Sequence, residues 1–259
     1  MIGTSTKLEK EYFRAHSEMI NDSENVRPLH VLVNAYDFVM NKYKETKDYK
    51  YILNQLKSIR QDMLLQNIKN DFCVKVYETS TEISILNEDM ENANITLSML
   101  IRDLYTTIHS ENEYQFYRYY LIYNILYDIK EMNYIIQEEK FNSYKNRMRD
   151  IIDIMKAMNE KNFIKLFSLF SKLNSEKEKK MLIPFVVYYQ IQAMIILSYG
   201  FYTMIDINYI YEKIGRDSTK EEFINFMKEI GVVMIDTKVK CRESISILKS
   251  SKYLYKKYK

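Results

Sequence analysis

The sequence contains very little glycine and proline: 4 Gly and 2 Pro in 259 residues, and it has no tryptophan. Glycine and proline supply the tight turns of β-sheets and the loops that hold nucleotide phosphates, so their scarcity argues against both kinds of structure. A chain of this length can bury a sizeable core without a metal or a disulfide. We therefore expect a mainly all-α fold.

Cysteine and histidine are equally sparse. Cys73 and Cys241 lie far apart, and no second Cys or His stands at metal-ligand spacing from either, so neither a disulfide framework nor a zinc site is expected. The three histidines, His16, His30 and His109, are dispersed, and no metalloprotease, nucleophile-elbow or phosphate-loop pattern occurs. The sequence predicts a protein that is not an enzyme, with no cofactor and no catalytic metal, in a reducing compartment.

Charge is absent from residues 181–205, a run of 25 positions that is long enough to span a bilayer. Pro184, Gln190 and Gln192 interrupt this run, and Asp206 follows it as a candidate helix cap. A buried helix is the preferred interpretation, with no membrane contact. The N-terminus lacks the apolar core of a signal peptide, so secretion is not expected.

Residues 26–199 show apolar side chains at helical spacing, separated by short polar joins. Leu32, Tyr36 and Val39 mark one such face, and Asp71 and Asp89 are candidate N-caps of two later helices. Successive antiparallel helices predict a solenoid-like helical-repeat region, of the TPR type, over residues 1–200.

The pattern changes after Ser198, because three of the four glycines fall in the last 60 residues. Helix, helix and then a β-hairpin is the order of a winged-helix domain, which we expect over residues 201–259. The expected elements are a helix capped by Asp206 and ended by Gly215, a helix from the Ser218/Glu221 capping box to Gly231, a strand at 232–235, a turn at 236–238 and a returning strand at 244–248.

Positive charge is concentrated at the C-terminal end. Residues 238–259 carry eight basic residues against one acid, a net charge of +7, whereas the whole chain is +3. Tyr253, Tyr255 and Tyr258 alternate with these cations, a composition that suits a phosphate backbone with stacked bases, although a solvated, frayed tail has the same composition. The winged-helix context favours RNA or DNA contact. The candidate nucleic-acid-binding residues are Lys238, Lys240, Arg242, Lys249, Lys252, Lys256, Lys257 and Lys259.

One segment resembles a known family. Residues 55–62 read Gln-Leu-Lys-Ser-Ile-Arg-Gln-Asp and are continued by Gln66 and by residues 70–79; residues 3–5, 8–10 and 26–29 match the opening of the same conserved core. The chain thus resembles the GANP/Sac-three/Thp-three group of PCI proteins, and specifically its Thp-three branch. The resemblance is dense to about residue 130 and faint beyond it. Departures from the family pattern occur at Asn54 and at residues 11–13 and 63–65.

The resemblance implies a PCI module, a helical repeat followed by a winged helix, that pairs with a second PCI protein of the Csn-twelve type. It also implies that the complex contains the small acidic protein Sem-one/Dss-one, held mainly by that partner. The implied role is that of a scaffold in transcription elongation and mRNA maturation. The implied location is the nucleus, with the cytoplasm as a second location. The candidate partner-binding residues are Val232, Val233, Ile235, Ile245 and Ile247. The signature residues, to which we give a structural role, are Gln55, Lys57, Ser58, Ile59, Arg60, Gln61 and Asp62.

Three other interpretations compete with a nucleic-acid-binding scaffold. A pure assembly subunit of a proteasome-lid-like complex would keep the fold without binding nucleic acid. A bacterial-type helical-repeat regulator would place its helix-turn-helix first, which is the reverse of the order here. A helical enzyme would need paired acidic motifs on facing helices, and none occurs in the sequence.

Overall fold

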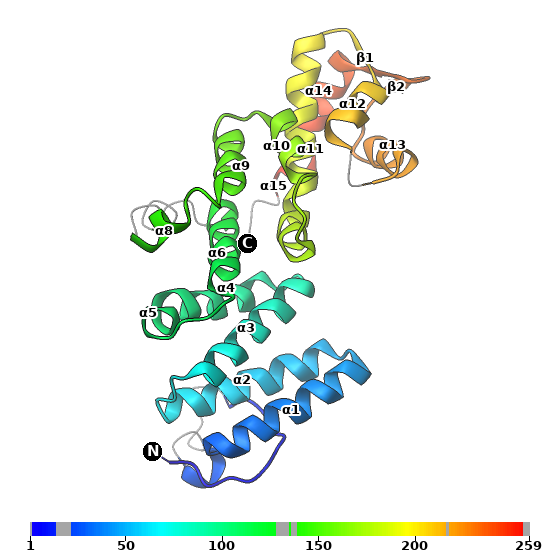
Figure 1. Ribbon diagram of the computed structural model, residues 1–259. Coiled ribbons are helices and arrows are strands. Elements are labelled where there is room, and N and C mark those ends of the chain that lie inside the picture. Colours follow the sequence, from blue (N-terminus) through cyan, green and yellow to red (C-terminus); the bar gives the residue numbers. More distant parts are fainter. Residues whose placement is uncertain (1, 14–21, 128–134, 136–138, 216–217, 256–259) are drawn as a thin grey trace. The chain divides into compact units, whose positions relative to one another are not determined.

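The computed structural model is mostly helical, as expected, and describes residues 2–13, 22–127, 135, 139–215 and 218–255 (Figure 1). It divides into two compact units, residues 1–123 and 124–259, and each unit is considered by itself. The boundary that we expected near residue 200 falls at the C-terminal end of helix α11, inside the second of these units.

The first unit is a series of helices in which neighbours along the chain pack together: α1 on α2, α2 on α3 and α3 on α4 (Figure 1). Asp89 caps α4 as predicted, accepting from the backbone N–H of Asn92, but α3 is capped by Asn70 and not by Asp71, which is its first residue. The elements are η2 Ser23–Asn25, α1 Leu29–Thr46, α2 Tyr49–Leu65, α3 Asp71–Leu86, α4 Met90–Met99, the π-helical turn η3 Leu100–Leu104, α5 Tyr105–Thr107 and α6 Glu113–Tyr127, in which the division between the units falls.

The segment before α1 lies against α2 and is held there by amide side chains of the signature region. Gln55 Oε1 accepts from the backbone N–H of Lys10 at 3.1 Å, and Gln61 both accepts from the N–H of Phe13 at 3.2 Å and donates to its carbonyl at 2.7 Å. Gln66 accepts from the N–H of Gly3 at 3.0 Å. These bonds give an extended segment the backbone partners that a strand neighbour would otherwise supply.

Asp62 anchors the same segment through charge. Its Oδ2 accepts from Arg27 Nε at 2.6 Å, and its Oδ1 accepts from Lys10 Nζ; the side chains of Asp62 and Arg27 are 0% exposed. Arg27 also donates to Ser58 Oγ at 2.8 Å and to the Leu8 carbonyl at 3.2 Å. Each charge in this buried cluster thus has a partner. The cluster links α2 to Arg27, which precedes α1, and to the N-terminal segment.

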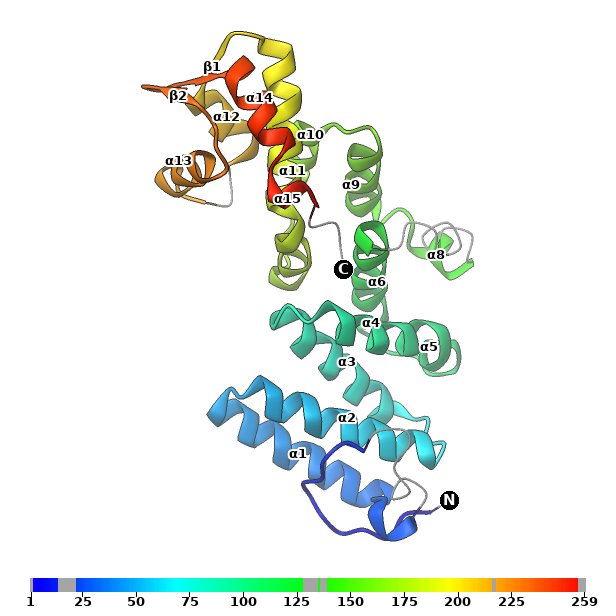
Figure 2. The ribbon, with the colours of Figure 1, turned by 180° about the vertical axis from the view of Figure 1, so that it is seen from behind.

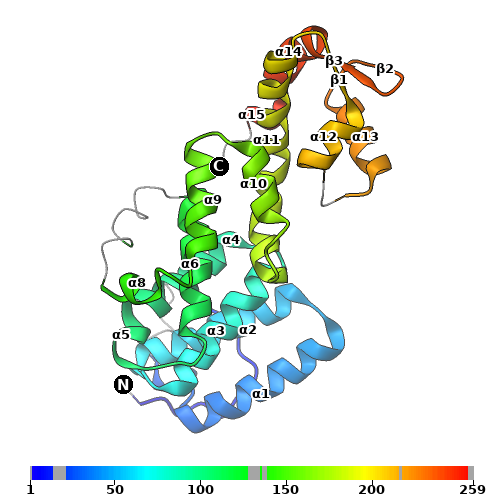
Figure 3. The same cartoon turned by 45° about the horizontal axis from the view of Figure 1, so that its top comes forward.

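The second unit is built around one long helix, α11. Figure 3 shows α10 beside α11 and the sheet at the C-terminal end of α11. The elements are α8 Glu139–Tyr144, α9 Arg149–Asn159, α10 Phe163–Phe170, α11 Glu176–Phe201, β1 Met204–Asp206, α12 Ile207–Ile214, α13 Lys220–Glu229, β2 Met234–Ile235, β3 Lys238–Lys240, α14 Cys241–Lys249 and α15 Lys252–Tyr255.

Helix α11 contains residues 181–201 of the uncharged run. By length and composition alone it could cross a membrane, but core helices of soluble proteins meet the same criterion. In this structure, 50% of its most apolar window is buried inside the fold. Met181, Phe185 and Met194 are 0% exposed and face the neighbouring elements of this unit. This face of α11 is therefore part of the core of the second unit.

The sheet has three antiparallel strands in the order β1-β3-β2. Strand β1, which the sequence did not predict, pairs with β3 so that Ile205 lies opposite Val239. The predicted first strand of the hairpin is shorter than expected, since β2 begins at Met234, and Val232 precedes it. Asp236, with a φ of 52°, and Thr237 form the turn, and Lys238 already belongs to β3.

The predicted returning strand at 244–248 is wrong: these residues belong to helix α14. The alternation Ser-Ile-Ser-Ile has the period of a strand, but Cys241, Ser244 and Leu248 have helical spacing, and each of these three is 0% exposed. Packing of α14 along α11, visible from behind in Figure 2, decides between the two patterns, because it buries the helical face. The small Ser244 also accepts from the Val233 N–H at 3.0 Å.

The predicted capping box is displaced by one residue. Thr219 is the N-cap of α13, and its partner is Glu222, not the predicted Ser218 and Glu221. Asp206 caps α12 and Gly215 follows its last residue, as predicted. Gly231 has a φ of +88°, a conformation that ordinary side chains disfavour, and it ends the turn after α13.

Candidate functional site

The cations of α14 lie over exposed tyrosines from the end of α11. The guanidinium of Arg242 is 4.1 Å from the ring centroid of Tyr202, and Lys249 Nζ is 5.1 Å from that of Tyr199. Tyr202 is 56% exposed and Tyr199 is 55% exposed. Each pair therefore presents a positive charge and an aromatic ring together at the surface of the second unit.

Two further pairs of this kind occur in the same unit. Lys213 Nζ lies 5.3 Å from the ring of Tyr209, whose edge meets Phe201 at 5.7 Å, and Lys252 Nζ lies 5.2 Å from the ring of Tyr253. We define the aromatic-basic surface as Tyr199, Tyr202, Tyr209, Lys213, Arg242 and Lys249.

The remaining predicted cations are distributed unevenly. Lys238 is exposed on β3, whereas Lys240 Nζ is bound to Glu243 at 2.9 Å, which reduces its availability for a phosphate. Lys256, Lys257 and Lys259 lie outside the described residues. Tyr199 and Tyr202 were missed at the sequence level, because they belong to the uncharged run, which we read as core; the recurrence of tyrosine at its C-terminal end was the available signal.

The first residues of the basic tail, Lys252–Tyr255, form helix α15 and pack against the fold, whereas a frayed tail would make no such contacts. Tyr253 in α15 donates to Glu229 Oε1 at 3.1 Å and lies 6.4 Å from the ring of Phe226, and α15 contacts α11. A truncation that begins at Lys252 would therefore remove structural contacts. One that begins at Lys256 leaves the described fold complete.

The predicted partner-binding residues are not on one pair of strands. Ile235 lies in β2, an edge strand, and is 48% exposed, whereas Val232 is 5% exposed and precedes β2. Ile245 and Ile247 are on α14, where Ile247 packs against Gly231 and remains 39% exposed. Of the five residues, Ile235 is the one that keeps both the strand edge and the exposure we expected.

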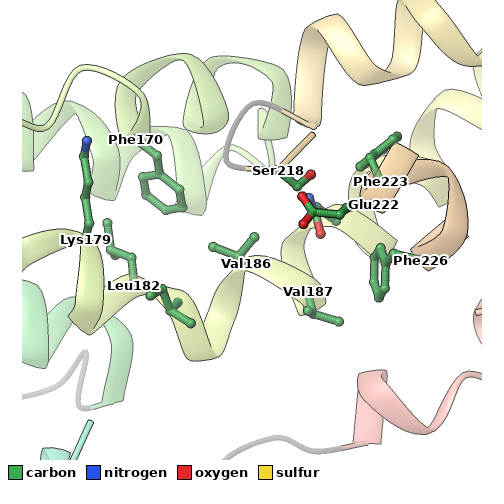
Figure 4. A pocket seen from close by; sticks show the side chains of 11 residues that line it. Phe170, Lys179, Leu182, Val186, Val187, Ser218, Glu222, Phe223 and Phe226 are labelled. Carbon is green, nitrogen blue, oxygen red and sulfur yellow. The ribbon is translucent and has the colours of Figure 1, made fainter. Parts of the chain in front are cut away.

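A separate apolar groove of about 610 Å³ lies between α10, α11 and α13 (Figure 4). Phe170 faces it from α10, Leu182 and Val186 from α11, and Phe223 and Phe226 from α13. Its lining includes no histidine and no cysteine. Lys179 and Glu222 are its charged lining residues, and most of the other lining side chains are apolar.

Among the described residues, no group of three or more His, Cys, Asp or Glu side chains could hold a metal ion. Burial raises the pKa of the Cys73 thiol to about 11, and burial also raises the pKa of Cys241. A thiol with a raised pKa is a poor nucleophile near neutral pH.

The chain belongs to the SAC3/GANP family, since a model of that family matches residues 3–235. It is 29% identical over 238 residues to a THP3 homolog of Schizosaccharomyces pombe, which covers 90% of this chain and 58% of the relative. It is 34% identical over 128 residues to Protein THP3 of Saccharomyces cerevisiae, covering 49% and 27%, and 28% identical over 219 residues to SAC3 family protein A of Arabidopsis thaliana, covering 82% and 21%.

These matches confirm the resemblance to the Thp-three branch that residues 55–62 indicated. The chain spans little more than half the length of the first of these relatives and about a quarter of the second.

Proposed function

We propose that this protein is a non-enzymatic PCI-type scaffold whose second unit contains a winged-helix fold and binds single-stranded RNA. In this proposal it pairs with a second PCI protein of the Csn-twelve type, which holds an acidic protein of the Sem-one/Dss-one type, and acts in nuclear mRNA maturation and transcription elongation. Family membership supports the scaffold class, and the order α12, α13, β2, β3 supports the winged helix.

The aromatic-basic surface is the observation on which RNA binding rests. A single strand exposes both phosphates and base faces, and cations beside rings can meet the two at once. Arg242 over Tyr202 and Lys249 over Tyr199 each offer this combination of a cation and a ring. The contacts carry little base information, so weak sequence preference is expected.

The exposed edge of strand β2 supports the proposed pairing with a second PCI protein. An edge strand has unpaired backbone groups that a second sheet can use, and Ile235 adds an exposed apolar side chain. The same edge favours the alternative function, a pure assembly subunit of a proteasome-lid-like complex that binds no nucleic acid.

The test is filter binding of labelled oligouridine RNA by the purified chain, alone and with its co-purified partner, after identification of that partner by mass spectrometry. Recovery of a PCI protein together with RNA retention supports the proposal. A PCI protein without RNA retention in either state would establish the assembly subunit instead. Recovery of metabolic enzymes alone would contradict the scaffold.

A further inference from the structure

A pocket of about 450 Å³ lies on the first unit, between α2, α3, α4 and the segment before α1. Helix α2 supplies most of its wall. The lining combines two cations with several apolar side chains. The lining residues are Tyr12, Lys57, Arg60, Gln61, Leu64, Leu65, Tyr77, Asn92 and Ile95.

Arg60 in this pocket is a buried cation that has no counterion in the described part of the chain. Its side chain belongs to a residue only 7% exposed, its Nη1 has no hydrogen-bond partner, and no carboxylate pairs with it among the described residues. The guanidinium carbon lies 5.5 Å from the ring centroid of Tyr77. Burial lowers the pKa of Arg60, since the charged form has lost water without gaining an anion.

The adjacent arginine shows that the fold can pair such a charge. Arg27 is 0% exposed, and Asp62, Ser58 and the Leu8 carbonyl all accept from it. Isolated buried charges are costly, and the penalty is normally offset by a paired anion. An unpaired arginine that lines a pocket beside a fully paired one indicates that the missing anion comes from outside the described residues.

Lys57 adds a second cation to the same wall. It stands three residues before Arg60 on α2, which places both side chains on one face of the helix, and it forms no ion pair with a described residue. Asp89 is the carboxylate whose pKa it influences, and the oxygens of Asp89 already accept from Tyr49 and Asn92. Lys57 and Arg60 thus place two positive charges on one wall of the pocket.

The outer part of the pocket is apolar and exposed. Leu64 is 58% exposed and Ile95 57% exposed, although both line the same pocket as the two cations. Exposed apolar side chains beside a concave charged wall are typical of a protein-binding surface.

We propose that this pocket binds an acidic peptide segment of a partner protein, with a carboxylate on Arg60 and Lys57 and a neighbouring apolar side chain on Leu64 and Ile95. The planar guanidinium matches a carboxylate in two parallel hydrogen bonds, which gives orientation as well as affinity. This site is independent of RNA binding and of the β2 edge, because it belongs to the other unit.

A peptide fits this pocket better than a nucleic acid does. A phosphate backbone needs several spaced cations, whereas this wall has two, and Leu64, Leu65 and Ile95 surround them. The ring of Tyr77 is 4% exposed and faces Arg60, so it offers no platform to a base.

The experiment uses the full chain and a fluorescein-labelled peptide of alternating aspartate or glutamate with leucine or phenylalanine, followed by anisotropy. The matched peptide carries asparagine and glutamine in place of the acids. The protein variants are Arg60→Gln and Lys57→Gln, and the control is Lys50→Gln, which removes an exposed cation from the same helix outside the pocket.

We expect the acidic peptide to bind the parent and the amide peptide to bind at least about 10-fold more weakly. Arg60→Gln should lose at least about 10-fold in affinity, Lys57→Gln a smaller factor, and Lys50→Gln nothing. Urea unfolding gives a second readout: without peptide, Arg60→Gln should unfold at the same or a higher urea concentration, because an unpaired charge has been removed.

Equal binding of the acidic peptide by parent and Arg60→Gln would overturn the proposal, as would equal binding of the two peptides. An oligouridine arm covers the other ligand class. If Arg60→Gln weakens RNA retention while the parent does not bind the acidic peptide, the pocket is a phosphate site and the proposal is wrong.

Discussion

Substitution of Asp62 by asparagine tests the anchoring of the N-terminal segment most severely. Asp62 is 0% exposed, is 2.6 Å from Arg27 Nε and also pairs with Lys10, so Asp62→Asn leaves two cations facing a neutral amide. Removing one partner of a buried ion pair costs about 3–5 kcal/mol. For a chain of this size, that loss lowers the thermal midpoint by roughly 10 °C, at about 3 °C per kcal/mol.

The assay is urea unfolding followed by circular dichroism, with an exposed ion pair as the control. Lys69 Nζ lies 2.6 Å from Asp103 Oδ1, but the two side chains are 43% and 35% exposed, so Asp103→Asn should cost less than about 1 kcal/mol. Adding Arg27→Met to Asp62→Asn should restore part of the loss, because the stranded charge is removed. A loss no larger in Asp62→Asn than in Asp103→Asn would refute the role of the buried cluster.

Three further predictions follow from single positions. A Cβ on Gly3 would lie 2.2 Å from the Val26 carbonyl oxygen, so Gly3→Ala should speed limited proteolysis before α1, whereas Gly200→Ala, which meets nothing within 4 Å, should leave that rate unchanged. Burial alone would raise the pKa of Asp89, but hydrogen bonds from Tyr49 and Asn92 hold that pKa below its usual value. Asp89→Ala should therefore lower the free energy of unfolding by about 1 kcal/mol at pH 7. The urea midpoints of parent and variant should converge as the pH falls below about 4, where the parent loses the charged cap. Ile235→Asp, at an exposed edge, should weaken capture of the proposed PCI partner without changing the circular dichroism spectrum; capture at the parental level would exclude the β2 edge as the interface.

The helical class of this fold follows from the sequence because apolar spacing, capping residues and the lack of glycine all agree. Asp89 and Asp206 are predictable as caps, since their side chains act on backbone groups two or three residues away. The sequence of α14 has both a strand period and a helical period, and the choice depends on packing against α11, which no local pattern contains. Strand β1 is equally non-local, because it exists only by pairing with β3.

The candidate sites differ in the same way. Net charge located the basic segment 238–259, but the rings beside Arg242 and Lys249 lie about 40 and 50 residues earlier in the chain, at the C-terminal end of α11, so charge patterning could not find them. The signature segment gave no indication that Asp62 is fully paired while Arg60, two residues earlier, is not. Pairing of this kind depends on which side of α2 faces the N-terminal segment.

The central claim, that the aromatic-basic surface binds single-stranded RNA, is tested most directly by the salt dependence of oligouridine binding. If the three cations of this surface and the exposed Lys238 and Lys252 of the same unit make three to five phosphate contacts at about 0.7 each, the logarithm of affinity should fall against the logarithm of salt with a slope of about 2 to 4. Arg242→Gln with Lys249→Gln should lower that slope by about 1, whereas Tyr199→Ala with Tyr202→Ala should weaken binding at every salt concentration and leave the slope unchanged. Lys165→Gln, an exposed cation on α10, should change neither quantity. Parental affinity and slope in both double variants would contradict the claim.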